Sequence, residues 1–170
     1  MITTAVAGRA WHFSHALGRP TNEHNGTTGG YRYPIDLAIA PDDILFVLSR
    51  GLGFEGALEH ADFGRIGKTT LDEEHIGDFA RTDFTWPNSI ALSKNGQLYV
   101  TDEHDNCVKV YNQDQVLPFS EFDPDGEWQR MWGEAGSGEG ELNGPAGIAF
   151  DSNNEAYIVD SKSHRVQKFT

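Results

Sequence analysis

The chain has 170 residues, enough for one domain, and its 38% hydrophobic content is too high for a disordered protein. Its formal net charge is −13, which argues against binding to the phosphate backbone of nucleic acids or to anionic membranes. The single cysteine, Cys107, excludes an intrachain disulfide. Cys107 falls where a strand is expected, which favours a small buried side chain over a reactive thiol.

Residues 1–30 are expected to form an N-terminal strand and a loop. Residues 1–17 lack the continuous apolar run of a signal peptide, and no segment of the chain has the length of a membrane span. The default expectation is therefore a soluble, cytoplasmic protein.

Three segments of the chain align with one another without gaps. In each, an apolar run follows a proline and is separated from a second apolar run by a turn, as in residues 33–49, 86–102 and 144–160. The runs are too short for helices, and Asn95-Gly96 is a strong hairpin signal because both turn positions tolerate positive φ. The repeat therefore predicts three antiparallel strand pairs.

Further strands are expected after each pair. Third strands are predicted at residues 64–67, 107–111 and 165–169, and fourth strands at 75–79 and 127–132. Four antiparallel strands per repeat make an all-β fold, a β-propeller with four-stranded blades. The predicted units are a blade at 31–80, a blade at 81–133 and an incomplete blade at 134–170.

The third copy closely resembles an NHL repeat in residues 133–151, 157–160 and 164–169. The second copy resembles it well, although Asn106-Cys107 stands where that family usually has Asn-Arg. The first copy has Ser49 in place of the aspartate. The resemblance implies a β-propeller, typically six-bladed, so this chain would supply about half of one.

Two explanations account for three blades. The chain is either a piece of a longer protein, or a half-ring that pairs with a second copy as a homodimer through its open blade edges. Residues 5–18 are a candidate for a fourth strand in the last blade, because propellers often close by pairing strands from the two ends of the chain.

Polar side chains gather in the loop that follows the second strand of each copy. Carboxylates and imidazoles around one face could bind a cation or a polar ligand. Alternatively, the aspartates accept backbone N–H bonds within a tight turn, whereas that turn does not require a histidine. The candidate ligand-binding residues here are Asp102, Glu103, His104, Asp160, His164 and Arg165.

In the first copy the same loop begins with Arg50. An arginine surrounded by carboxylates could anchor an anionic ligand, and the alternative is a surface ion pair of little energetic consequence.

The resulting functional prediction is a binding or scaffolding module for a protein, a peptide or a small polar ligand. The alternative, which the resemblance implies, is a metal-dependent propeller enzyme, a lyase or a lactonase-like hydrolase, with its site at the central channel. No catalytic residue can be matched to such enzymes here. No cofactor is predicted, and Ca²⁺ or Zn²⁺ are the ions to consider.

Overall fold

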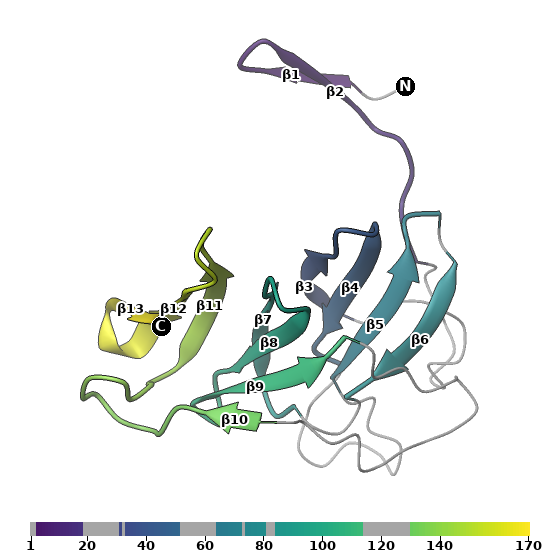
Figure 1. The fold of residues 1–170 in the computed structure, drawn as a ribbon. Helices are drawn as coiled ribbons and strands as arrows, with labels where there is room; N and C mark the ends of the chain where they lie inside the picture. Colours follow the sequence, from purple (N-terminus) through teal and green to yellow (C-terminus); the bar gives the residue numbers. More distant parts are fainter. Residues whose placement is uncertain are drawn as a thin grey trace.

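The computed structural model describes residues 3–18, 31, 33–51, 64–72, 74–80, 84–113 and 130–170. These residues form a two-stranded N-terminal sheet and three larger antiparallel sheets, which follow one another along the chain and lie side by side in Figure 1. Among the described residues, no helix has the length and apolar character needed to cross a membrane.

Each sheet is made of strands that are consecutive in the sequence. Blade 1 has the order β3-β4-β5-β6 and blade 2 the order β10-β9-β8-β7, so every strand pairs with its chain neighbour. The bounds are β3 Pro34–Ile39, β4 Ile44–Ser49, β5 Arg65–Thr70, β6 His75–Phe79, β7 Pro87–Leu92, β8 Gln97–Asp102, β9 Cys107–Asn112 and β10 Arg130–Trp132.

Blade 3 contains β11 (Pro145–Phe150), β12 (Ala156–Asp160) and β13 (Arg165–Phe169), with the short 3-10 helix η1 (Ser161–Ser163) between the last two. The prediction of a β-propeller with about three antiparallel blades is confirmed. The fourth strand predicted at residues 127–132 is β10, and residues 127–129 lie outside the described residues.

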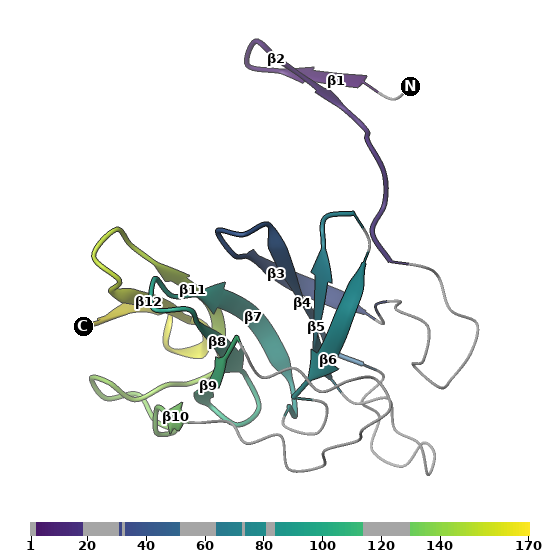
Figure 2. The same cartoon turned by 45° about the vertical axis from the view of Figure 1, so that its right-hand side comes forward.

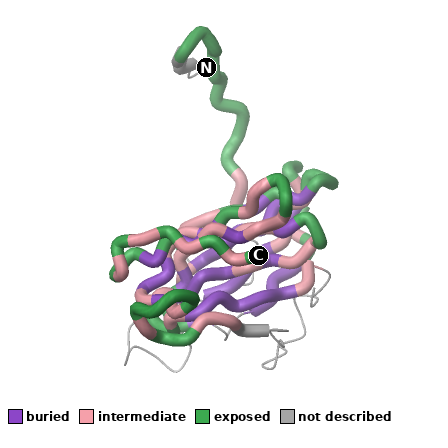
Figure 3. The backbone as a smooth tube through the Cα atoms, turned by 60° about the vertical axis from the view of Figure 1, so that its left-hand side comes forward, coloured by how far each residue is buried: buried purple, intermediate pink, exposed green. Residues whose placement is uncertain are grey.

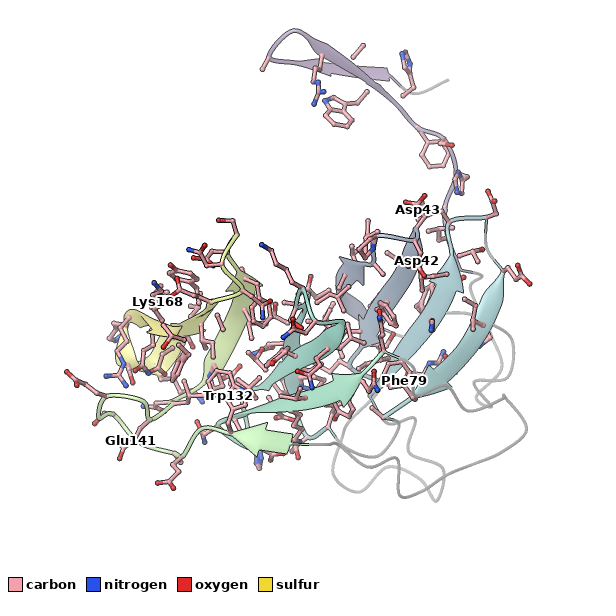
Figure 4. All side chains as sticks on the ribbon, viewed as in Figure 1. Asp42, Asp43, Phe79, Trp132, Glu141 and Lys168 are labelled. Atoms are coloured by element: carbon pink, nitrogen blue, oxygen red, sulfur yellow. The ribbon has the colours of Figure 1, made fainter. Side chains whose placement is uncertain are left out.

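The turns between the first two strands of each blade have the same local geometry. Asp43, Gly96 and Asn154 all have positive φ, at 62°, 77° and 67°. Gly, Asn and Asp tolerate this region, which explains why these residue types punctuate the apolar runs. All three hairpins turn at the same end of the molecule, which is the upper end in Figure 1. Figure 4 labels Asp42 and Asp43 there.

The blades pack face to face through two hydrophobic clusters. The cluster between blades 1 and 2 includes Phe46 and Phe79 from blade 1, and Val100 and Tyr111 from blade 2. The cluster between blades 2 and 3 includes Val108, Leu142, Ile148 and Ile158, with Trp132 and Phe169 packed edge to face at 4.7 Å. In Figure 3 the buried residues, in purple, run through the strands of the blades.

The N-terminal segment differs from the sequence-based expectation. It forms its own hairpin from β1 (Thr3–Val6) and β2 (Arg9–His12) and does not add a strand to blade 3. Ala7 and Gly8 connect the two strands with φ of 49° and 78°, the geometry of a two-residue hairpin turn. Local pairing through this turn closes a much shorter loop than pairing with β13 would. The hairpin projects away from the blades (Figures 1 and 3).

Candidate functional site

Asp102, one of the predicted site residues, is fully buried and stabilises the turn around it. Its carboxylate accepts hydrogen bonds from the backbone N–H groups of Thr85 at 2.8 Å and Trp86 at 3.0 Å. The buried Lys109 ammonium lies 3.1 Å from it. Asp102 thus joins the end of β8 to the segment that enters β7, and it offers no free lone pair to a ligand from outside.

Asp160 has the same role in blade 3 and is also fully buried. It accepts bonds from the Asn143 amide at 2.6 Å and from Arg165 Nε at 2.8 Å. Burial alone would raise the pKa of Asp160, but these two partners outweigh it and hold the pKa below its ordinary value. Arg165 is occupied as well, because its other guanidinium N–H groups donate to the carbonyls of Ser137, Gly138 and Glu141.

Among the described residues, the hydrogen bonds of Arg50 go to neutral groups, and its charge helps to lower the pKa of the Glu103 carboxyl. Its guanidinium reaches across to blade 2, where it donates to the Pro87 carbonyl at 3.1 Å and to the Asn88 side-chain oxygen. The same group stacks over the Trp86 ring, 4.4 Å from its centroid. Arg50 therefore connects two blades. It directly follows Ser49, which stands where the other copies have a buried aspartate.

The polar contacts continue from blade 2 to blade 3. Asn88 Nδ2 donates to Glu103 at 2.9 Å, and Glu103 forms an ion pair with Lys162 at 3.2 Å. The hydrogen bond from Asn88 holds the pKa of Glu103 below its ordinary value, and Lys162 acts in the same direction against partial burial. We call this surface the inter-blade array, which consists of Arg50, Trp86, Asn88, Glu103 and Lys162.

Sequence analysis identified Arg50 and Glu103 in the inter-blade array but missed its other three members. Trp86 and Asn88 flank the proline of the second copy, and Lys162 occupies the same loop position as His104. The array lies at the end of the molecule opposite the hairpin turns, in the loops after β4, β8 and β12 and at the start of β7. We call this end the loop face (Figure 2).

The two candidate histidines remain exposed on the loop face. The His104 side chain is 70% exposed, with Nδ1 3.1 Å from Asp105. His164 has a φ of 53°, equal to that of Asn106 at the matching loop position, so the turn fixes its backbone while its ring faces outward. Within the described ranges, no three His, Cys, Asp or Glu side chains are grouped so as to hold a metal ion.

Cys107 is the first residue of β9, directly after the turn that follows β8, and it is buried. Burial raises the pKa of its thiol to about 11, and the neighbouring Lys109 ammonium only partly opposes this effect. The thiolate is the reactive form, so the folded protein holds almost none of it near neutral pH.

We therefore expect Cys107 to react with iodoacetamide at about pH 8 more than about a hundredfold more slowly in the folded protein than in urea, where its pKa returns to about 8.5. Mass spectrometry of the alkylated protein over time measures both rates. Similar rates in the two conditions would contradict the buried position.

Comparisons with known proteins agree with this architecture. The NHL repeat profile matches residues 84–111 and 142–169, which contain β7–β9 and β11–β13. A search of curated proteins gives no match.

Two solved structures share the fold. One is virginiamycin B lyase from Staphylococcus aureus, with a TM-score of 0.53 and 12% identity over 88% of this chain and 39% of that chain. The other is a protein of unknown function from Bacteroides caccae, with a TM-score of 0.51 and 13% identity over 81% of this chain and 42% of that chain. This chain thus spans about two fifths of either structure. The NHL repeat thus matches two of the three blades, and the chain is similar to NHL-repeat β-propellers.

Proposed function

We propose that the chain is a binding or scaffolding module that holds a protein or peptide segment, or a small polar ligand, on its loop face. The observation that carries this proposal is the inter-blade array, which presents Trp86, 41% exposed, stacked against Arg50. Tryptophan and arginine are the residue types that most often dominate the binding energy of an interface. The array also spans three blades, which is a footprint suited to an extended partner.

The chemistry of the loop face favours a partner with both apolar and polar groups. Trp86 offers an aromatic surface, and around it lie a guanidinium, an amide and the Glu103–Lys162 ion pair. The net charge of −13 opposes a polyanionic partner such as RNA. A peptide supplies apolar side chains for the ring together with backbone donors and acceptors for the polar groups.

Selection from a displayed random-peptide library on the folded chain tests this proposal. We expect the selected peptides to bind Trp86→Ala at least about tenfold more weakly than the unaltered protein, a loss of about 1.4 kcal/mol. Trp11→Ala is the matched control, because Trp11 is 59% exposed on the N-terminal hairpin, away from the loop face. Peptides that bind both variants equally well would count against the loop face as the binding site.

The alternative function is a metal-dependent enzyme. Two observations keep it in view: one structural neighbour is a lyase, and two histidines are exposed on the loop face. Atomic emission analysis after dialysis against Ca²⁺ or Zn²⁺ separates the two functions. A stoichiometric ion that His104→Ala or His164→Ala removes would favour the enzyme, and a metal-free protein that still binds peptides would favour the module.

A further inference from the structure

The outer face of blade 3 exposes side chains whose equivalents are buried in the other blades. Val166 is 62% exposed, whereas Ile66 and Val108, at the same position of their third strands, are both 0% exposed. Each of these residues pairs across the sheet with one partner on the second strand, and those partners are Leu48, Thr101 and Val159. Of these partners, only Val159 is exposed, at 42%.

The outer face of blade 1 shows the complementary pattern. Leu37 is 53% exposed, whereas Ile90 and Ile148, which also stand three residues after the proline of their copies, are 4% and 8% exposed. Ile39 lies two residues further along β3 and is 54% exposed. Their cross-strand partners on β4, Val47 and Leu45, are buried at 6% and 5%, so the open part of this face is β3. Blades 1 and 3 are the two ends of the row of sheets in Figures 1 and 2, so both open faces lie at its ends.

These two positions share a buried cluster in both of the interfaces between the described blades. Ile66 of blade 1 and Ile90 of blade 2 belong to one buried cluster, and Val108 of blade 2 and Ile148 of blade 3 belong to the other. Val166 therefore presents one half of a recurring interface, and Leu37 presents the other half.

We propose that two copies of this chain associate with blade 3 of each copy packed against blade 1 of the other. Two identical interfaces related by a twofold axis would then close a ring of six blades. Closed propellers have about four to eight blades, and two sets of the three described blades make six, which lies within this range. A second copy carries both halves of the recurring interface.

One backbone donor on the outer face of blade 1 is already paired within the chain. Inside the molecule, the backbone N–H of Ile90 donates to Asp36 at 2.9 Å, and that of Ile148 approaches Ser89 Oγ at 3.4 Å. The equivalent N–H in blade 1, that of Leu37, already bonds to the side chain of Asp36 in its own blade at 2.9 Å. Its burial against a second copy therefore leaves no unpaired donor, and the penalty for one is avoided.

Sedimentation velocity of the full chain tests the proposal, in about 0.3 M salt to screen the repulsion between two chains of charge −13. We expect a species of twice 18.8 kDa.

Leu37→Lys and Val166→Glu should each raise the dissociation constant at least about a hundredfold, because each buries an unpaired charge. Both positions are exposed within one copy, so circular dichroism should show both variants folded. Leu71→Lys, in the turn after β5, is the control and should leave the dimer intact.

An equimolar mixture of the two charge variants provides the sharpest outcome. In a mixed dimer, one of the two interfaces pairs the introduced lysine of one copy with the introduced glutamate of the other, and the second interface is unaltered. The mixture should therefore recover a dimer that neither variant forms alone.

A monomer at about 0.1 mM would overturn the proposal. A dimer that survives both substitutions would also overturn it, since association would then run through strand edges or the β1–β2 hairpin. A mixture that stays monomeric would overturn the blade 3-to-blade 1 pairing. The proposal is independent of the proposed function, because peptide binding can be measured on monomeric Leu37→Lys, whose loop face is unaltered.

Discussion

Replacing Phe79 with alanine is expected to lower the free energy of unfolding by about 3–5 kcal/mol. Phe79 ends β6 and is 4% exposed (Figure 4). Its ring packs edge to face against Phe46 of its own blade at 6.4 Å and against Tyr111 of blade 2 at 6.2 Å. The substitution therefore leaves a cavity in the interface between two blades and removes two aromatic contacts.

Urea unfolding followed by circular dichroism measures this loss. Phe13→Ala is the matched control, because Phe13 is 60% exposed and should change stability by no more than about 0.5 kcal/mol. A loss below about 1 kcal/mol for Phe79→Ala would mean that blades 1 and 2 do not pack through this ring. A loss of the expected size is a large fraction of the stability of a typical domain.

The second large effect is expected for Asp102→Asn, which should destabilise the protein by about 3 kcal/mol or more. The carboxylate accepts two backbone N–H bonds and pairs with the buried Lys109. An asparagine amide has only one acceptor oxygen, so its NH₂ group would face the Lys109 ammonium, and part of a buried cation would lose its partner.

Thermal unfolding of Asp102→Asn and three further variants separates the ion pair from the turn. Asp42→Asn changes an exposed aspartate in the β3–β4 turn and should have little effect. Lys109→Met removes the other partner of the pair. If the two groups act together, the loss in the double variant Asp102→Asn/Lys109→Met should be smaller than the sum of the single losses. Strict additivity would show that Asp102 supports only the backbone.

The stability of the loop face and its proposed binding role depend on different residues. Asp102, Asp160 and Arg165 form hydrogen bonds within and beside their own turns. The inter-blade array and the exposed histidines lie on top of this support. Substitutions at Trp86 or His104 should therefore change binding while leaving the fold intact, which makes the proposed experiments interpretable.

The sequence alone predicted the strands of the three blades, but not the β1–β2 hairpin. Every strand in blades 1 and 2 pairs with its neighbour in the chain, so apolar runs and turn residues were sufficient to place them. The turn after β7 is an example: it is placed by Asn95-Gly96, although only Gly96 has the positive φ that the signal implies for both residues. The sequence also offers the turn-stabilising role of Asp102 as one of two alternatives, because an aspartate that recurs at one register indicates a turn.

Only the tertiary structure decided which residues meet between blades. Arg50 contacts Pro87, 37 positions away, and Glu103 contacts Lys162 in the next blade. No local pattern encodes such contacts, because they depend on how one sheet is placed against the next. The same is true of the open faces: Leu37 and Val166 follow the same apolar pattern as their buried equivalents, and only the packing of the blades leaves them exposed.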